Sequence, residues 1–487
     1  MLRFMIAVLA LAGLFAPAAA SAGGDADLSA ACRSIDPIEA YTLCRKIASA
    51  QFAGRLTGHE GYTAAAEWAA STFAEWGLAP AGDGEGYLQA YPSPYTVVDS
   101  ARMVLHPAAG GDREAMAPAD TVLAAGIDFM PQLFTDAGSR DAGLVFAGWG
   151  ISAPELGWDD YAGIDAAGRF VVCFRGTPGG GEKFEPHDEH RKRMETAKDK
   201  GAAGLLYIYP EPIANPNGDR IEGFMTAIIS EKTADLILAE KGTDCGRLKN
   251  DLSGSDHPLS FALNATISYD VASRHFPSGT GYNVAAYIEG SSPEHRGECV
   301  VVGGHLDHCG LHMGMLFTGA NDNASGSATV MAIARAFSAL GEKPKRSVVF
   351  VLFGGEEKGL EGSRRFAGAL PRGFERVDAM FNFDMTGEGE GVNCGYTPDP
   401  PGLLELIQRA GAEIGALRRT WKIEHVGVRS SDFAPFFLNG ASCAAFFSNG
   451  PHLHYHMTGD TIHRINPEIL ADTARLGFLA AYRWADR

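Results

Sequence analysis

The sequence predicts an α/β protein with a mixed, mostly parallel sheet flanked by helices. Two observations carry this prediction: uninterrupted apolar runs at residues 299–302 and 347–353, and apolar residues at helical spacing over residues 325–340 between them. Short apolar runs without polar alternation are typical of parallel strands that are buried on both faces. Strands that alternate with helices favour an α/β sheet.

Each predicted strand ends at residues whose side chains can bind a metal ion or transfer a proton. The first run leads into His305, the second leads into Glu356-Glu357, and a third run, residues 379–383, ends at Asp384. Ligands of α/β sheets collect at the carboxyl ends of the strands. We therefore expect these side chains to converge on one crevice.

The residue types at these positions are those that hold a pair of metal ions. Further candidates are Asp322, just before the predicted helix, and His456 near the carboxyl end of the chain. Two zinc ions a few ångströms apart require a bridging carboxylate, one histidine and one further carboxylate on each ion, and a free acid beside the water. The chain offers such a set, so the sequence favours a hydrolase with two metal ions.

Around these residues the chain resembles the M28 family of zinc peptidases, which are aminopeptidases with a two-zinc site. The stretches that carry the resemblance stand in the family's order over roughly residues 283–487: GGHLDHCG, TGANDNASGSA, FGGEEKGLEGS, NFDMTG, SSDFAPF and YHMTGDT. Near the amino end, FAGRLTGHEGYTAAAEWAASTFAEWGL resembles the opening helices of the family. The resemblance implies the zinc peptidase fold.

The resemblance also implies a role for each candidate residue. Asp322 would bridge the two zinc ions, and Glu356 would be the general base. Asp307 would accept the second ring N–H of His305 and fix its tautomer. Tyr455 would polarise the substrate carbonyl or stabilise the oxyanion, with a packed aromatic as the alternative. The remaining ligands would be His305 and Asp384 on one zinc, and Glu357 and His456 on the other.

Residues 120–268 differ from the flanking segments in composition and in predicted secondary structure. They contain β-rich runs broken by Gly and Pro, with a helix predicted near residues 191–200. At Gly148-x-Gly150 and Asp160-Tyr161 the segment resembles a protease-associated (PA) domain, a small β-rich module often inserted into peptidases of this family. The predicted organisation is a signal peptide at 1–22, an N-terminal part of the peptidase domain at 23–119, an inserted PA-like domain at 120–268 and the catalytic domain at 269–487.

The expected activity is that of a zinc-dependent exopeptidase with two Zn²⁺ per chain. A zinc-bound hydroxide would attack the peptide carbonyl, and Glu356 would pass its proton to the leaving amine. The expected partners are peptide substrates with a free N-terminus, because a free α-amine fits beside one zinc and nearby carboxylates. Two alternatives stay open: a glutaminyl cyclase-like enzyme with a single zinc, and a catalytically inactive PA/M28 binding protein.

Composition and the amino end indicate an exported protein. The formal net charge of −18 argues against nucleic-acid or anionic-membrane partners, because phosphate binding depends on basic patches. Residues 1–22 have a basic start, a short apolar core and small residues at the end, the pattern of a secretory signal peptide. The apolar run is too short to span a bilayer. We expect a periplasmic or extracellular protein without a membrane anchor.

Export permits disulfides among the 8 cysteines, but their pairing stays open. Cys32 and Cys44 are close in sequence and are one candidate pair. For Cys309 we expect no metal role, because the ligand set is complete without a thiolate.

Two further groups have alternative interpretations. The segment 187–190, His-Asp-Glu-His, precedes three basic residues and is interpreted as a solvated face. Four aromatic residues are candidates for an apolar pocket that receives the first side chain of a substrate, with core packing as the alternative: Phe433, Phe436, Phe437 and Phe446.

Overall fold

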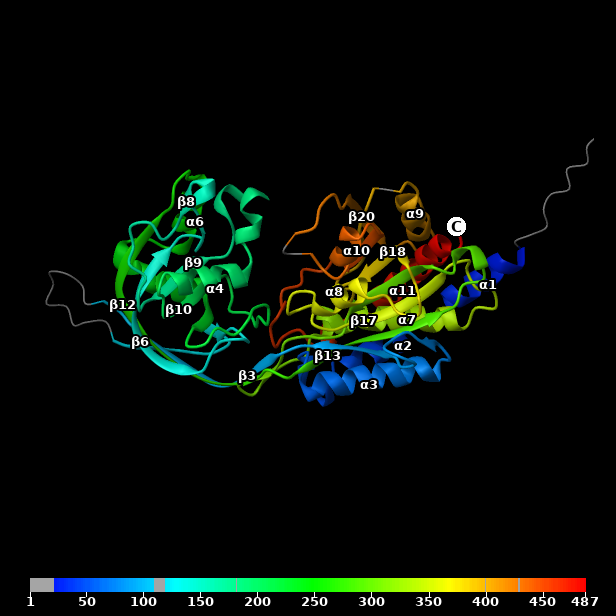
Figure 1. The fold of residues 1–487 in the computed structure, drawn as a ribbon, viewed down its shortest axis with the longest axis horizontal. Coiled ribbons are helices and arrows are strands. Elements are labelled where there is room, and N and C mark those ends of the chain that lie inside the picture. The colour runs from blue at the N-terminus through cyan, green and yellow to red at the C-terminus, as the bar shows by residue number, and fades with distance from the viewer. Residues whose placement is uncertain (1–21, 109–118, 181, 399, 428–429) are drawn as a thin grey trace, which may run out of the picture.

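The computed structural model describes residues 22–108, 119–180, 182–398, 400–427 and 430–487. The predicted signal peptide lies outside the described residues except for its last position, Ala22. The chain forms two bodies that lie side by side and are connected by long strands (Figure 1). The larger body contains both the N-terminal helices and the C-terminal helix.

In the described part of the chain, nine strands form the sheet of the larger body. They are β1 (Ala79–Pro80), β2 (Leu88–Pro92), β13 (Thr280–Ile288), β14 (Glu298–His305), β17 (Ser347–Phe353), β18 (Arg376–Phe383), β19 (Val392–Tyr396), β20 (Leu417–Lys422) and β21 (Ser442–Ser448). Their order is β1-β13-β17-β14-β18-β21-β19-β20, and β2 pairs with β13. The central strands β17, β14, β18 and β21 are parallel to one another. Strand β13 is antiparallel to β17, and β19 is antiparallel to β21 but parallel to β20.

Helices cover both faces of this sheet. One face carries α1 (Ala22–Arg33), α2 (Pro37–Ile47), α3 (Glu60–Glu75), α7 (Gly326–Ser338), α9 (Leu403–Ile414) and α11 (Pro467–Ala485). The other face carries the shorter helices α8 (Glu361–Gly368) and α10 (Ala434–Leu438). Helices on both faces explain why the central strands are apolar without alternation.

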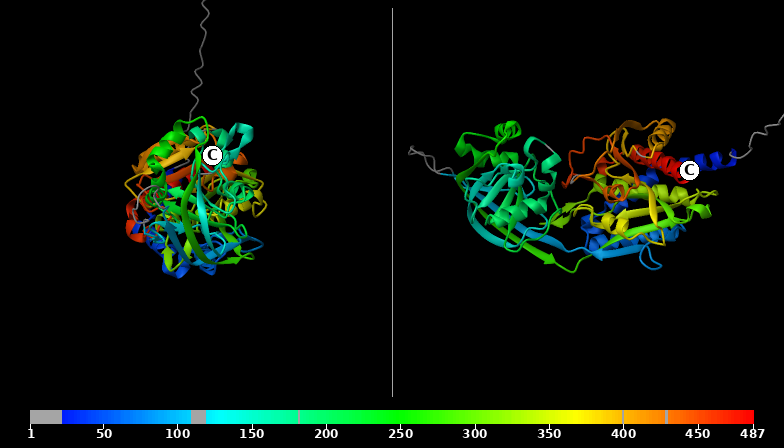
Figure 2. Two further views of the ribbon diagram at one scale, coloured as in Figure 1. Left: turned by 90° about the vertical axis from the view of Figure 1, so that its left-hand side faces the viewer. Right: turned by 45° about the horizontal axis from the view of Figure 1, so that its top comes forward.

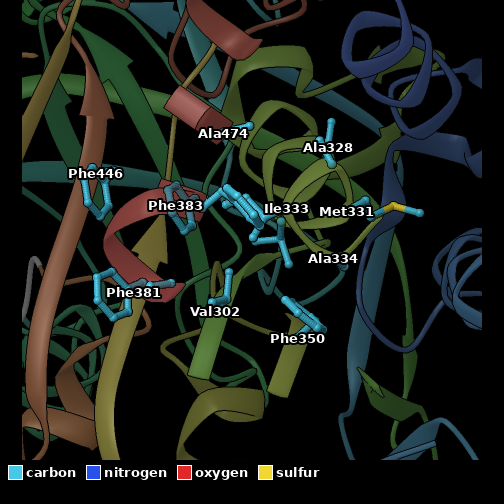
Figure 3. Packing of buried hydrophobic residues seen from close by; sticks show 14 of the residues in the cluster. Val302, Ala328, Met331, Ile333, Ala334, Phe350, Phe381, Phe383, Phe446 and Ala474 are labelled. Carbon is cyan, nitrogen blue, oxygen red and sulfur yellow. The ribbon is translucent and has the colours of Figure 1, made fainter. Parts of the chain in front are cut away.

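Successive residues of a strand point to opposite faces, and the two cores follow this rule. On β17, Val348 and Phe350 pack in the core beneath α7, whereas Val349 and Val351 belong to the core beneath α8 and α10. Figure 3 shows Ile333 of α7 among the strand residues of the first core. The central sheet is therefore fixed from both sides, and its strand ends form a rigid platform.

The second body also has a mixed sheet. In the described residues its eight strands are β3 (Tyr95–His106), β4 (Thr121–Leu123), β5 (Phe129–Pro131), β6 (Gly138–Ala147), β9 (Phe170–Phe174), β10 (Gly204–Tyr209), β11 (Met225–Ser230) and β12 (Ser260–Phe276). The order is β4-β3-β12-β6-β9-β10-β11-β5, and β6, β9, β10 and β11 are parallel. Helix α4 (His190–Asp199) packs on one face, and α5 (Glu231–Leu238) and α6 (Cys245–Gly254) pack on the other.

Two short hairpins complete the strands: β7 (Ser152–Ala153) with β8 (Trp158–Asp159), and β15 (Gly310–His312) with β16 (Met315–Phe317). Asp160, directly after β8, accepts hydrogen bonds from the backbone N–H groups of Trp149, at 3.2 Å, and Ile151, at 2.9 Å. Gly148 has a φ of +43°, and a Cβ at this position would lie 2.5 Å from Asp160 Oδ1. The glycine-rich motif and the acid therefore form one buried turn.

The two bodies are joined by paired strands, which Figure 2 shows, and by a small buried cluster. Strand β3 begins at Tyr95 and β12 ends at Phe276, so the second sheet uses residues on both sides of segment 120–268. Between the bodies a junction cluster contains Met130, Leu133, Ala214, Cys309 and Phe317, none of which is more than 3% exposed. A buried apolar contact of this kind limits relative motion of the bodies.

The structure confirms the predicted fold class and its central elements. The apolar runs become β14, β17 and β18, and the two predicted helices appear as α7 and α4. Among the described residues, no helix has the length and apolar character to cross a membrane. All eight cysteines are buried as free thiols within the described residues, so Cys32 and Cys44 are unpaired there.

Candidate metal centre

Strand ends and two turns bring the predicted residues together. His305 is the last residue of β14, Asp384 directly follows β18, and Glu357 follows β17 by four positions. His456 lies in the loop between β21 and α11. The carboxyl ends of parallel strands meet at one edge of a sheet, which explains why residues far apart in sequence converge here.

Asp322 lies in a tight turn before α7, and a second acid holds this turn. The carboxylate of Asp460 accepts a hydrogen bond from the backbone N–H of Asn321, at 2.8 Å, and another from that of Asp322, at 3.0 Å. Asp460 is 2% exposed. The final motif of the chain therefore positions Asp322 as well as supplying His456.

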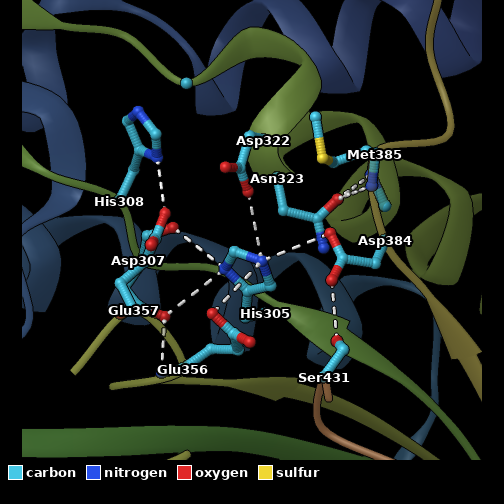
Figure 4. A network of polar contacts seen from close by, with 12 residues as sticks. His305, Asp307, His308, Asp322, Asn323, Glu356, Glu357, Asp384, Met385 and Ser431 are labelled. Atoms are coloured by element: carbon cyan, nitrogen blue, oxygen red, sulfur yellow. Dashed lines mark hydrogen bonds and ion pairs between the residues drawn. The ribbon is translucent and has the colours of Figure 1, made fainter. Parts of the chain in front are cut away.

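The two carboxylate oxygens of Asp322 face different histidines. Oδ1 lies 3.3 Å from His305 Nε2, and Oδ2 lies 3.2 Å from His456 Nε2. His305 Nε2 is also 3.5 Å from Asp384 Oδ1, and His456 Nε2 is 2.8 Å from Glu357 Oε2. Two half-sites result, with Asp322 shared between them; Figure 4 shows the half-site around His305.

Three of these four distances, 3.2, 3.3 and 3.5 Å, are close to those between ligands of a zinc ion, and the fourth, 2.8 Å between His456 and Glu357, is shorter. Ligand atoms at the corners of a tetrahedron about 2.0–2.2 Å from zinc lie about 3.3–3.6 Å apart. Three buried atoms, Asp322 Oδ2, Asp384 Oδ1 and His456 Nε2, have no hydrogen-bond partner among the described residues. Buried polar atoms without partners are costly unless something else satisfies them. The donor set is also of the nitrogen and carboxylate type that zinc prefers.

Glu356 differs from the five residues of the half-sites. Its side chain is 17% exposed, and its Oε2 lies 3.9 Å from His305 Nε2. Its backbone N–H donates a hydrogen bond to Asp307 Oδ1 at 3.2 Å. Glu356 therefore borders the centre and faces the open cleft, as a group that exchanges protons with a substrate must do.

Asp307 lies close to the outer nitrogen of His305. His305 Nδ1 is 3.3 Å from the Asp307 backbone oxygen and 3.6 Å from its carboxylate Oδ1. Both oxygens are acceptors, so Nδ1 carries the hydrogen and Nε2 is left for a ligand role. His456 has a similar arrangement with a distant partner, because its Nδ1 donates to the backbone oxygen of Ala214 at 2.8 Å.

Sequence reasoning gave no role to several residues that hold the ligands. His308 is fully buried, and its Nδ1 lies 2.8 Å from Glu357 Oε1. Ser431 donates a hydrogen bond from Oγ to Asp384 Oδ2 at 2.7 Å. His308 lies in the motif GGHLDHCG, three residues after His305, and Ser431 lies in the motif SSDFAPF. Their positions in these motifs could have indicated that they support the ligands.

Cys309 lies near the second half-site. Its thiol is grouped with ligand atoms of His308, Glu357 and His456 within 4.8 Å of one another, and all four residues are buried. The Cys309 Sγ contacts the backbone oxygen of Ala214 at 3.8 Å. The thiol therefore fills the space between this half-site and the second body.

Burial and mutual charge shift the acids in different directions. Burial opposes ionisation of Glu357, but His456 and His308 outweigh it and hold the pKa of Glu357 at about 2. For Asp322, burial is likewise outweighed by His305 and His456, so its pKa lies well below the usual range. Burial and neighbouring acids raise the pKa of Glu356 well above its usual value. Negative charge is thus favoured on Asp322 and Glu357, and Glu356 retains a proton more readily than either of them.

A cavity of about 540 Å³ opens directly onto the half-sites. Of the four candidate phenylalanines, Phe433 lines this cavity. Phe436 and Phe446 are at most 1% exposed in the two cores, so the pocket interpretation is wrong for them, and Phe437 packs against a core. The cavity wall comes instead from other residues, including Trp421, Ile423 and Phe447.

A second cavity, of about 850 Å³, lies between the bodies on the other side of Glu356 and Glu357. Its lining includes Arg175, His190 and Asn215 from the second body and Tyr455 from the larger one. His190 is 5% exposed. The interpretation of segment 187–190 as a solvated face is therefore wrong for His190 and for Asp188, which is also 5% exposed. Other residues of the second body contact them: Arg175 and Arg193 pair with Asp188, and Asn215 and Tyr207 contact His190.

Tyr455 lines both cavities and is 45% exposed. Its ring stacks on that of His456 with centroids 3.8 Å apart. It is therefore a residue of the cleft and not of a core.

Comparison with known proteins agrees with this arrangement. Residues 283–480 match the model of peptidase family M28. Over this segment, which is less than half of the chain, the protein is similar to peptidase family M28. All the ligand candidates described above lie within the M28 segment, as do Glu356, Asp307 and Tyr455.

Among curated relatives, the M28 segment is similar to leupeptin-inactivating enzyme 1 of Streptomyces exfoliatus, with 33% identity over 36% of this chain and 37% of that protein. An aminopeptidase of Pseudomonas aeruginosa is 25% identical over 84% of this chain and 69% of its own length. The chain spans less than half the length of two curated relatives, 37% of the S. exfoliatus enzyme and 47% of a probable zinc metalloprotease of Leptosphaeria maculans.

Solved structures share the whole fold, including the second body. An aminopeptidase from Aneurinibacillus sp. strain AM-1 is 20% identical with a TM-score of 0.65, and the match covers 93% of this chain and 94% of that chain. A peptidase M28 precursor from Shewanella amazonensis SB2B is 21% identical with a TM-score of 0.66, covering 95% and 97%. Two bodies with this fold and arrangement therefore occur in other proteins.

Proposed function

We propose that this protein is a zinc-dependent aminopeptidase that removes N-terminal residues from peptides. The observation that carries the proposal is the position of Asp322, whose two oxygens lie 3.3 and 3.2 Å from Nε2 of His305 and His456. Asp384 and Glu357 complete the two half-sites. When bound, two zinc ions supply Lewis acidity that activates water and polarises a peptide carbonyl.

The chain's own residues would perform the proton transfers and hold the substrate. Glu356 faces the cleft and has a raised pKa, so it can take a proton from the attacking water and return it to the leaving amine. Asp307 fixes the tautomer of His305 through Nδ1. Tyr455, at the border of both cavities, is placed to donate a hydrogen bond to the substrate carbonyl.

The cavity next to the centre supports exopeptidase action. Its 540 Å³ is of a size to receive one terminal residue, and its lining combines the acids of the centre with Trp421, Ile423, Phe433 and Phe447. The acids attract a free α-amine, and the aromatic wall receives an apolar side chain. Peptides with a free N-terminus and an apolar first residue are the proposed substrates.

The second body is proposed to be a PA-like domain inserted at residues 120–268, between an N-terminal part at 23–119 and a catalytic domain at 269–487. Its placement beside the 850 Å³ cavity supports a role in access to the centre. Residues 1–22 are proposed to direct export to a periplasm or the medium.

Hydrolysis of matched peptides tests the proposal. Zinc-loaded protein is incubated with a leucyl peptide, its N-acetylated form and an internally labelled longer peptide. Release of leucine from the free peptide alone is expected. Cleavage of the acetylated peptide at an internal bond would contradict aminopeptidase action. Cyclisation of N-terminal glutamine without hydrolysis would favour the single-zinc cyclase, and failure on all three peptides would favour an inactive binding protein.

A further inference from the structure

A backbone segment of the second body contacts the candidate ligand His456 twice. The Ala214 N–H donates a hydrogen bond to the His456 backbone oxygen at 3.0 Å. The Ala214 backbone oxygen accepts a hydrogen bond from His456 Nδ1 at 2.8 Å. These residues are 242 positions apart in sequence and belong to different bodies.

The second contact determines the state of the imidazole. A carbonyl oxygen only accepts hydrogen bonds, so the hydrogen of neutral His456 must lie on Nδ1. Nε2 then presents a lone pair toward Asp322 and Glu357, as a ligand must. Acceptors of this kind orient metal-bound histidines, and their loss weakens metal binding by about 10- to 100-fold.

Two further contacts keep Ala214 in this position. Ala214 is fully buried in the junction cluster, against Cys309 and Phe317 of the M28 domain. Nearby, Arg191 of the second body donates from Nη2 to the backbone oxygen of Lys358 at 2.9 Å, and Lys358 directly follows Glu357. The second body therefore contacts one ligand of the second half-site, His456, directly, and contacts Lys358, the residue after the other ligand, Glu357.

We propose that Ala214 is a positioning residue of the metal centre, so that seating of the second body and occupation of the His456–Glu357 half-site are thermodynamically coupled. This inference rests on the proposed zinc centre. The coupling is reciprocal: zinc at this half-site holds the second body in place, and the seated second body strengthens zinc binding. His305 of the other half-site differs, because its outer nitrogen faces the backbone oxygen of Asp307, two residues further along the same chain segment, and not the second body.

Zinc affinity of full-length variants tests the coupling. Ala214→Leu places a larger side chain in the closed junction cluster and should displace the 214 carbonyl from His456. Arg191→Met removes the bond to Lys358. Its matched control is Arg220→Met, because Arg220 is equally exposed, at 31%, but pairs with Asp136 inside the second body. Chelator competition should show one of two zinc ions weakened about 10-fold or more in Ala214→Leu, a smaller loss in Arg191→Met and no change in the control.

Amide hydrogen exchange gives a second readout that does not depend on activity or on a variant. The Ala214 N–H should exchange faster in zinc-free protein, because its acceptor is the backbone oxygen of His456. Equal exchange with and without zinc, or two unweakened zinc ions in Ala214→Leu and Arg191→Met, would overturn this inference and leave the proposed function intact. A wild-type chain that binds no zinc would overturn both.

Discussion

Ser431 donates a hydrogen bond to Asp384 at 2.7 Å and so fixes the outer oxygen of a candidate metal ligand. The inner oxygen, Oδ1, lies 3.5 Å from His305 Nε2. Asn382 in turn donates to Ser431 Oγ at 3.0 Å. A strand end and a distant loop therefore cooperate to hold one carboxylate in a single orientation.

Replacing Ser431 with Ala should weaken the binding of one zinc by about 10- to 100-fold, because Asp384 Oδ2 loses the hydrogen bond that orients it. Chelator competition measures this loss. Ser430→Ala is the matched control, since the Ser430 hydroxyl accepts from the Gly427 N–H and contacts none of the ligands. Equal zinc affinity in both variants would show that Ser431 does not contribute to zinc binding through Asp384.

Glu356→Gln should keep both metal ions and lower kcat by about 10²- to 10⁴-fold, because the amide cannot accept the proton. Metal content and peptide hydrolysis are measured on the same sample. Glu424→Gln serves as control, since Glu424 lines the same cavity without belonging to either half-site. Hydrolysis by Glu356→Gln at the wild-type rate would refute the general-base assignment.

Arg55→Met should destabilise the larger body by at least about 3 kcal/mol, because buried acceptors lose a charged donor. The fully buried guanidinium donates to the backbone oxygens of Leu306, Ile47, Thr318 and Gly319 at 2.7–2.9 Å. Denaturant unfolding of zinc-free protein measures the change. Arg45→Met, at an exposed position of α2, should change stability by less than about 0.5 kcal/mol.

Asp160 should make the stability of the second body depend on pH. Burial raises its pKa to about 7, so the folded state holds a proton that the unfolded state releases above about pH 4. The stabilisation of the second body by protonated Asp160 is fully present below about pH 4 and is lost as the pH rises to about 7. The difference is about 4 kcal/mol at most.

Thermal unfolding at pH 5 and pH 7.5 measures this dependence. Asp160→Asn should flatten it, because the amide does not titrate. Asp159→Asn, at a partly exposed neighbouring position, should keep the wild-type slope. An unchanged slope in Asp160→Asn would assign the pH dependence to other groups.

Much of the fold and most residues of the candidate metal centre could be predicted from apolar runs and short motifs in the sequence. From residue 348 onward the strand of residues 347–353 is apolar, because it is buried on both faces. Its polar continuation marks the strand end at which Glu356 and Glu357 stand. The five proposed ligands lie in short motifs whose residue types already suit zinc. The structure brings all five together.

Long-range packing could not be predicted in the same way. Ala214 acts through its backbone, so no side-chain type indicates its contact with His456. His190 has polar neighbours in sequence but is buried against Asn215 and Tyr207, which lie at a distance along the chain. Phe436 and Phe446 have the same residue type as the cavity residue Phe433, and only strand and helix orientation directs them into the cores.

The central claim is that Asp322 bridges two zinc ions. The most direct measurement is the zinc stoichiometry of purified wild-type protein and of Asp322→Asn, determined after dialysis against a defined free zinc concentration. We expect two zinc ions per wild-type chain. In Asp322→Asn both ions should bind more weakly, because each half-site loses its shared carboxylate. One ion in the wild type, or two firmly bound ions in Asp322→Asn, would contradict it.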